Sequence, residues 1–295
     1  MVKIEKTLFI ILSLLHVSCS IEETPYSNSL ISSPHPLASQ AGKIIYSKGG
    51  NAFDAAVASA FALSVVEPSM SGIGGRLQVI YKQAGGDIFG IDATTQIPES
   101  FKTEGEEFPS YGYSTIGIPG VVAGLIKLHE ENGVLDIKTV MEPSISLAED
   151  GFYLYPGEIK RQQSDKEKIE SFEGTKLYFL NSEGESFRPG DKLVQKDLAN
   201  TLKIISSEGK KGFYEGYVAE SIENDMKKNG GLITRADLKN YNPVWRLPLI
   251  SNYRGNKVIT MGPPSSGGVH IIQMLNVLEN YQLNSYVHNL SLIHI

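Results

Sequence analysis

The sequence predicts one unit of mixed helices and strands, of the α/β or α+β class. Segments with apolar residues at helical spacing alternate with short β-branched runs, no internal repeat is present, and no interior linker divides the chain. With 295 residues, 41% of them hydrophobic, the chain can bury a substantial core, as one large domain or two smaller ones.

The charge and cysteine content exclude several classes of function. The net charge of −6 is spread along the chain and offers no basic patch for nucleic acid. The charged cluster at 160–173 alternates in sign, which predicts a solvated helix face. A lone cysteine forms no internal disulfide, and the sequence has no H-E-x-x-H motif or cysteine pair for a metal. We expect neither a metal nor an organic cofactor.

The N-terminus has the features of a secretion signal. Two lysines precede an apolar run, Leu8 to Leu15, which is too short to cross a bilayer of roughly 30 Å. Cys19 follows at a position that resembles a bacterial lipoprotein cleavage site; the alternative is an ordinary cleaved signal with an incidental cysteine. We expect a signal peptide at 1–19, with Cys19 as the candidate lipidation site, and a flexible tether at 20–33. The protein is then periplasmic or lipid-anchored in the bacterial envelope, with membrane contact only through that anchor.

The first elements of the main domain, which we place at 34–288, are two helices. Pro36 to Ser47 has helical spacing and is followed by two glycines, which are typical just past helix ends. Asn51 is placed to cap the next helix. The run from Ala55 to Leu63 is apolar nearly all round, which predicts a helix buried on most sides. Glu67, before a proline, ends it and is expected to have a structural partner.

A hairpin is expected next. A glycine-rich stretch, 71–75, precedes strands at Leu77 to Lys82 and Ile88 to Asp92, joined by a short glycine turn. The order of helix, glycines and strand is not that of a nucleotide-binding loop. Further helices are expected at Val121 to Glu131, from Asp136 to near Gly151, at Lys196 to Glu208, at Val218 to Asn229 and after a capping box at Thr234, with 157–192 as an irregular surface excursion.

The last block predicts two strands and a tight corner. Strands are expected at Val244 to Ile250 and Lys257 to Met261. A Pro-Pro-Ser-Ser-Gly-Gly loop follows, and then apolar residues at helical spacing from Val269 to Leu278. We expect this strand-to-helix corner to pack in a core, with Ser265 and its neighbour stabilising the turn.

Motif logic finds no self-contained active site, because no G-x-S-x-G elbow is present and the six histidines are scattered. Several collinear blocks nevertheless resemble the large-subunit half of the γ-glutamyltransferase family, also called γ-glutamyltranspeptidases or glutathione hydrolases. These blocks are HPLASQAGKIIYSKGGNAFDAAVASAFALSVVEP from His35, SGIGG, GIPGVVAGL, SLAEDGF, FYEGYVAESIENDMKKNGGLITRADLKNY from Phe213, and PPSSGG.

The resemblance implies an αββα sandwich of the N-terminal-nucleophile hydrolase type, incomplete in this chain. It implies an inactive precursor that cuts itself and frees a threonine as the first residue of a small subunit. A freed α-amino group, with a pKa near 8, can act as general base for the threonine hydroxyl. The γ-glutamyl group of glutathione or a related compound then passes to water, an amino acid or a peptide.

Two departures from the family pattern affect the expected site. No threonine lies in the family's Thr-Thr/Ser-His context, so we expect the nucleophile beyond this chain, in its small subunit, and no catalytic residue within it. Residues 289–295 do not resemble the family and form a doubtful tail. Thr94 stands where the family places an arginine that binds the substrate carboxylate, and a hydroxyl cannot form that bidentate contact.

Arg76 is the candidate for the missing cation, because relatives usually keep glycines and an aromatic at 76–78; the alternative is an exposed or ion-paired loop residue. Asp92 and Gln96 are expected to order the substrate-binding loop or to satisfy turn backbone. Three functions remain open: γ-glutamyl transfer or hydrolysis, a related amidohydrolase with another acyl group, and a non-catalytic envelope binding protein.

Overall fold

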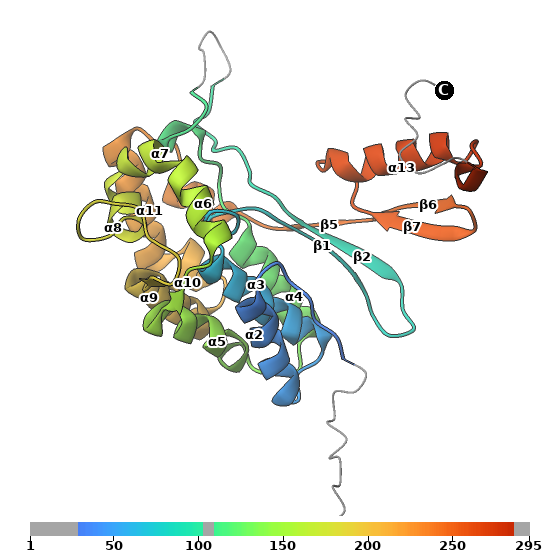
Figure 1. Ribbon diagram of the computed structural model, residues 1–295, viewed down its shortest axis with the longest axis horizontal. Coiled ribbons are helices and arrows are strands. Elements are labelled where there is room, and N and C mark those ends of the chain that lie inside the picture. The colour runs from blue at the N-terminus through green and yellow to red at the C-terminus, as the bar shows by residue number, and fades with distance from the viewer. Residues whose placement is uncertain (1–28, 103–108, 286–295) are drawn as a thin grey trace, which may run out of the picture.

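The computed structural model describes residues 29–102 and 109–285. The signal peptide, Cys19, most of the tether and the 289–295 tail lie outside the described residues. A helical body carries a small sheet that extends toward an arm made of a β-hairpin and one long helix (Figure 1). Among the described helices, none is long and apolar enough to cross a bilayer.

Helices α2 (Pro36–Ser47) and α3 (Ala52–Val66) form the centre of the body, as predicted. The Asn51 side chain accepts from the backbone N–H groups of Phe53 and Asp54 at 2.9 and 3.0 Å, which confirms the expected cap. Phe61 and Val65 of α3 are fully buried. The apolar helix packs against α2 on one side and the later helices α4 and α5 on others, so its all-round hydrophobicity is explained.

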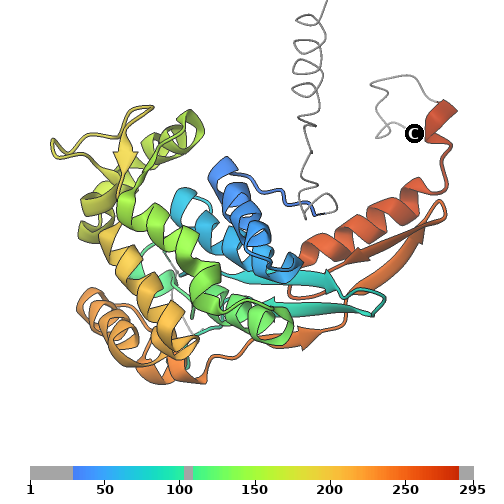
Figure 2. The same ribbon diagram turned by 90° about the horizontal axis from the view of Figure 1, so that it is seen from below.

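The predicted hairpin is confirmed as β1 (Leu77–Lys82) and β2 (Ile88–Ala93), paired antiparallel with Leu77 opposite Ala93. A short third strand, β5 (Val244–Arg246), adds to β2 with Trp245 opposite Ile91. Figure 2 shows helices α2 and α3 lying across this sheet from one side.

The continuous strand expected at Val244 to Ile250 is wrong. It divides into β5 and β6 (Leu249–Tyr253), and β6 pairs with β7 (Asn256–Thr260) in a separate hairpin of the arm. Pro248 lies at the division, where it supplies no backbone N–H and restricts the residue before it.

The helices of the middle region agree closely with expectation, except that the short helix α10 (Lys211–Tyr214) was not expected. Two further strands are short, β3 (Phe152–Tyr153) and β4 (Lys192–Leu193), and 3-10 turns occur at Tyr113–Thr115 and Leu283–Ser285. The helices are α4 (Val121–Asn132), α5 (Ile137–Asp150), α9 (Lys196–Glu208), α10 (Lys211–Tyr214), α11 (Gly216–Asn229) and α12 (Arg235–Asn240).

The irregular excursion expected at 157–192 is wrong. The segment contains α6 (Pro156–Ser164), α7 (Lys166–Glu170) and α8 (Glu173–Phe179). Glu158, Ile159 and Gln162 of α6 are buried. Their spacing of three and four places them on one side of the helix, and the mixed charges around them hide that buried face in the sequence.

Helix α13 (Ser266–Leu278) confirms the strand-to-helix corner but not its expected burial. Among its described residues only Gly268 is buried, and Ile271, Met274 and Val277 are 45, 56 and 59% exposed. The helix lies on β6 and β7 at the outer end of the molecule (Figure 1). Apolar spacing predicted the helix correctly, but it does not say which surface covers each face.

Candidate functional site

A polar cleft of about 500 Å³ lies where the start of β1, the end of β2 and the loop before α13 meet. Arg76 and Thr94, both expected from the sequence, lie on its wall. Gln96 does not; it lines a neighbouring hollow, and its side-chain nitrogen donates to the backbone oxygen of Asn242 at 3.4 Å. The residues that line the cleft are Arg76, Leu77, Gln78, Thr94, Thr95, Pro264, Ser265 and Ser266.

Thr94 is held in its position by Asp92. The backbone N–H of Thr94 donates to Asp92 Oδ1 at 3.1 Å, and its hydroxyl donates to the same oxygen at 2.7 Å. Arg246 Nε donates to the other carboxylate oxygen at 3.0 Å. Asp92 is only 5% exposed. It therefore satisfies turn backbone, one of its two expected roles, and it does so directly behind the cleft wall.

The charge state of Asp92 follows from these contacts. Burial alone would raise the pKa of its carboxyl group, but the hydrogen bonds from Thr94 and the charge of Arg246 outweigh burial and leave the pKa below 3.8, its ordinary value. Asp92 is therefore ionised at neutral pH and acts only as an acceptor.

Two buried tyrosines fix the backbone on the other side of Thr94. The Tyr241 hydroxyl donates to the Thr94 carbonyl at 2.7 Å. Its ring stacks on Tyr214 with the centroids 5.6 Å apart. The Tyr214 hydroxyl donates to the Pro119 carbonyl at 2.8 Å and accepts from the Ala123 N–H at 3.3 Å. Burial raises the pKa of both phenols, so both hydroxyls stay protonated and can donate.

The glycine-rich stretch before Arg76 is attached to the same framework. The backbone oxygen of Gly75 accepts from the N–H of Gly120 at 2.8 Å, at the start of α4. A Cβ on Gly120 would lie 2.0 Å from the Ala93 carbonyl oxygen and 2.3 Å from the Tyr241 hydroxyl. Only glycine allows this approach, so the GIPG block connects the glycine-rich stretch to the end of β2.

Arg76 itself is exposed, and no ion pair of its guanidinium occurs within the described residues. The side-chain nitrogen of Gln78 is buried and has no hydrogen-bond partner in the described part of the chain. Since both groups are donors, this wall of the cleft offers hydrogen bonds to an acceptor or an anion.

Sequence reasoning missed that Ser265 and Ser266 line the cleft. The backbone N–H of Ser265 donates to the Gly262 carbonyl at 3.1 Å and closes the turn, but its side chain forms no helix cap. The backbone comes very close at Gly268, where a Cβ would lie 2.0 Å from the Met261 oxygen. The loop before α13 thus carries its hydroxyls to the cleft, a placement that depends on the three-dimensional fold.

An ionic network holds the segment that leads into the glycine-rich stretch. Arg161 donates to Glu67 at 2.5 Å and to Glu158 at 2.9 Å, and Ser69 donates to Glu158 at 2.6 Å. This contact supplies the structural partner expected for Glu67. Burial raises the pKa of Glu67, and the charge of Arg161 opposes that effect. Arg161 lay within the charged cluster and had no separate signal in the sequence.

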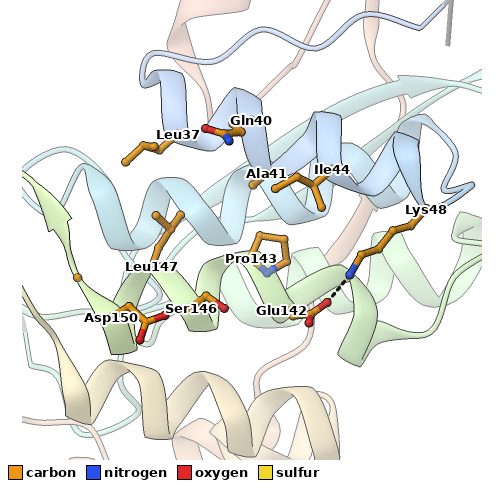
Figure 3. Close-up of a pocket in the computed structure, with 11 residues that line it drawn as sticks. Leu37, Gln40, Ala41, Ile44, Lys48, Glu142, Pro143, Ser146, Leu147 and Asp150 are labelled. Carbon is orange, nitrogen blue, oxygen red and sulfur yellow. Dashed lines mark hydrogen bonds and ion pairs between the residues drawn. The ribbon is translucent and has the colours of Figure 1, made fainter. Parts of the chain in front are cut away.

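A second hollow, of about 440 Å³, lies between α2 and α5 (Figure 3). Leu37, Ile44 and Leu147 give it an apolar floor, and an ion pair between Lys48 and Glu142 closes one end. Ser146 and Asp150 also line it, but no hydrogen bond joins these two side chains. Within the described residues, no group of three or more His, Cys, Asp or Glu side chains is arranged to hold a metal.

The family model described as gamma-glutamyltranspeptidase matches residues 38–294. The glutathione hydrolase proenzyme of Escherichia coli K12 is 36% identical over 92% of this chain and 49% of its own length. The acylase ACY 1 proenzyme of Pseudomonas sp. strain SE83 is 37% identical over 91% of this chain and 50% of its own length. The chain therefore spans about half the length of the curated relatives it matches.

Solved structures agree with this result. The γ-glutamyltranspeptidase of Helicobacter pylori matches with a TM-score of 0.86 and 41% identity, over 89% of this chain and 78% of that one. The enzyme from Pseudomonas nitroreducens, solved as a complex with L-DON, matches with a TM-score of 0.80 and 31% identity, over 86% of this chain and 76% of that one. These neighbours confirm the expected α+β fold of the N-terminal-nucleophile hydrolase type. The chain belongs to the γ-glutamyltranspeptidase family.

Proposed function

We propose that this chain is the large-subunit portion of a self-processing threonine-nucleophile enzyme that transfers or hydrolyses γ-glutamyl groups. The observation that carries the proposal is the family match over 38–294, together with the polar cleft at the place where the sequence pattern puts substrate binding. The nucleophilic threonine then belongs to the small-subunit part of the family, which this chain does not span.

The chemistry divides between the two parts. The threonine hydroxyl gives its proton to its own α-amino group and attacks the γ-amide carbonyl. The C–N bond then breaks, the amine leaves with that proton, and an acyl-enzyme remains. Water or a second amine attacks the acyl-enzyme and releases the acyl group. Backbone N–H groups stabilise the oxyanion. This chain contributes the wall that binds the acyl group. In that role Arg76 supplies positive charge, while Asp92 and Tyr241 keep the backbone of Thr94 in place.

The exposed apolar side of α13 is evidence that another subunit covers this helix in the complete protein. Ile271, Met274 and Val277 on the helix would be unusual as a free surface. In the complete protein its own small subunit is the partner of matching chemistry. This argues against a stand-alone envelope binding protein, which would leave the patch in water.

The experiment is to express the full-length gene and follow the precursor by intact mass. Self-cleavage should produce a new N-terminal threonine, and the product should hydrolyse γ-glutamyl-p-nitroanilide. In that enzyme Arg76→Ala should raise KM for acidic donors about tenfold, because a charge-assisted contact is lost. Arg188→Ala, which changes an arginine outside the cleft, is the control. A precursor that stays intact and inactive would refute the proposal, and an unchanged KM would refute the role of Arg76.

A second candidate is an amidohydrolase with another acyl group. It is favoured by Thr94, which removes the expected carboxylate contact, and by the 37% identity to the acylase ACY 1 proenzyme. Comparing γ-glutamyl-p-nitroanilide with glutaryl-p-nitroanilide separates the two functions, since the glutaryl group lacks the α-amino and α-carboxyl groups of glutamate.

The envelope location and the lipid anchor at Cys19 are also proposals. Incorporation of labelled palmitate into the wild-type protein, and its loss in Cys19→Ser, is the expected result for an anchored lipoprotein. Labelling that is absent from both would instead favour an ordinary cleaved signal with a periplasmic product.

A further inference from the structure

The hydrogen bonds around Thr94 determine what it can offer to a ligand. Its N–H and its hydroxyl both donate to Asp92 Oδ1, at 3.1 and 2.7 Å. Its carbonyl oxygen accepts from the Tyr241 hydroxyl at 2.7 Å. A threonine hydroxyl has a single proton. Thr94 therefore has no donor left for the cleft, and what it presents there is the lone pairs of Oγ1.

The direction of the hydroxyl bond is set by the charge of Asp92. An ionised carboxylate is acceptor-only, so the proton between the two side chains belongs to Thr94. A hydroxyl that donates to a carboxylate forms a charge-assisted bond, which is stronger than the bond between two neutral groups. Turning the proton toward the cleft would break that bond and leave a nearly buried charge with fewer partners.

Hydrogen-bond donors and an acceptor lie side by side in the cleft. Leu77 pairs with Ala93 and Gln78 with Asp92, and the same register sets Arg76 opposite Thr94. Arg76 and Gln78 offer donors, whereas Thr94, backed by Asp92, offers an acceptor. Arg246 balances the Asp92 charge through Oδ2, but it lines a different hollow, beside Trp245. Among the described lining residues Arg76 is therefore the cation that a carboxylate would meet in this cleft.

We infer that Thr94 selects acyl donors that present a hydrogen-bond donor, an ammonium or a primary carboxamide, where the family's arginine receives a carboxylate. This inference rests on the proposed function and narrows its substrate class. A carboxylate placed against Oγ1 would meet oxygen lone pairs and the negative charge behind them, so it would turn to Arg76 instead. An N–H group of the substrate would instead donate to a lone pair of Thr94 Oγ1. Any acidic group of the same substrate would pair with Arg76.

The test uses two γ-linked p-nitroanilides and the self-processed, full-length enzyme. The isoglutamine compound carries an ammonium and a carboxamide, and the glutaric acid compound carries neither of these donors. Thr94→Val should lower kcat/KM for the isoglutamine compound about tenfold and change the value for the glutaryl compound by less than about twofold. Thr94→Ser, which keeps the hydroxyl, should retain the wild-type ratio. Thr94→Arg should reverse the ratio in favour of the glutaryl compound.

Thr139→Val is the matched control. Thr139 donates its N–H to Asp136 Oδ1 at 3.0 Å and its hydroxyl to Oδ2 at 2.6 Å, so an aspartate also holds its hydroxyl, at an exposed helix start. We expect this variant to leave both values unchanged. The inference is overturned if Thr94→Val lowers the glutaryl value as much as the isoglutamine value, because the hydroxyl would then donate to the carboxylate.

A binding measurement distinguishes a failure of this inference from a failure of the proposed function. Titration calorimetry with free isoglutamine and free glutarate needs no turnover. If the full-length protein neither cleaves itself nor hydrolyses an anilide, the proposed function fails. The inference still stands if Thr94→Val weakens isoglutamine binding about tenfold and spares glutarate. If the enzyme is active but both ligands respond equally, or neither binds, the inference fails.

Discussion

Removing the hydroxyl of Tyr241 tests the framework on which the cleft depends. Tyr241→Phe keeps the ring and its stacking on Tyr214, since the two aromatic planes are only 9° from parallel. The change deletes the 2.7 Å hydrogen bond to the Thr94 carbonyl and little else. Because Tyr241 is 1% exposed, water cannot readily replace the lost donor.

The magnitude follows from the asymmetry of buried hydrogen bonds. A made bond contributes about 1 kcal/mol net, whereas a buried acceptor left without a partner costs about 1–3 kcal/mol. We expect Tyr241→Phe to lie in the latter range, which corresponds to a fall in Tm of roughly 2–10 °C for a domain of this size. Tyr214→Phe removes a hydroxyl with two backbone partners, so its loss of stability should be similar.

The assay compares both variants in the full-length protein by thermal melting and by kinetics on the isoglutamine anilide. Both should melt earlier. Only Tyr241→Phe should also raise KM, because only Tyr241 contacts Thr94 directly. The reasoning is refuted if Tyr241→Phe melts within about 1 °C of wild type, or if the two variants change KM equally.

Three other predictions concern the same framework. Gly120→Ala should destabilise by about 2 kcal/mol or more through overpacking, whereas Gly72→Ala, with no atom within 4 Å of its Cβ, should melt like wild type. The pKa of Asp92 in the folded protein lies below 3.8 because its hydrogen bonds outweigh burial. Its contribution to the free energy of unfolding is therefore present above about pH 4 and is lost as the pH falls through that pKa. Acid titration should show wild type losing more stability than Asp92→Asn below about pH 4. Arg161→Gln should lower the free energy of unfolding by about 1–2 kcal/mol after solvent screening, because it leaves the carboxylate of Glu158, which is 3% exposed, without its ion pair. Denaturant unfolding curves would measure this loss.

Most of the helices could be predicted because their signals are local. The cap at Asn51 and the capping box at Thr234 act over three residues, and both are present as expected. The hairpin of β1 and β2 likewise needs only two β-branched runs and a glycine turn. Such elements are specified by neighbours in the chain, so a single sequence is enough to place them.

The features that were mispredicted depend on distant partners. Leu247 and Pro248 divide one expected strand into two sheets, and the pairing of each half is decided by strands elsewhere in the chain. The apolar face of α13 gives no local sign of being exposed. The buried side of α6 could not be predicted, because it depends on contacts with Glu67 and Ser69, which lie about 90 residues away in sequence.

The candidate site was only partly accessible to the same reasoning. Arg76 and Thr94 were found because the family pattern changes at those positions, and the structure places both on one cleft. The hydrogen bond from Tyr241 to Thr94 joins residues 147 positions apart, and the bond from Arg246 to Asp92 spans 154. No sequence motif indicates such a pair, so the role of Thr94 as a hydrogen-bond acceptor emerged only from the fold.

The way Thr94 is held also explains how its side chain can vary. The backbone around it is fixed by the Asp92 carboxylate, the Tyr241 hydroxyl and the close contact at Gly120, of which only the carboxylate also binds the Thr94 side chain. The other two contacts do not involve that side chain, so we expect a substitution at this position to leave the main-chain path in place. Because the backbone is held largely independently of the side chain that faces the cleft, a change at Thr94 can alter recognition without altering the fold.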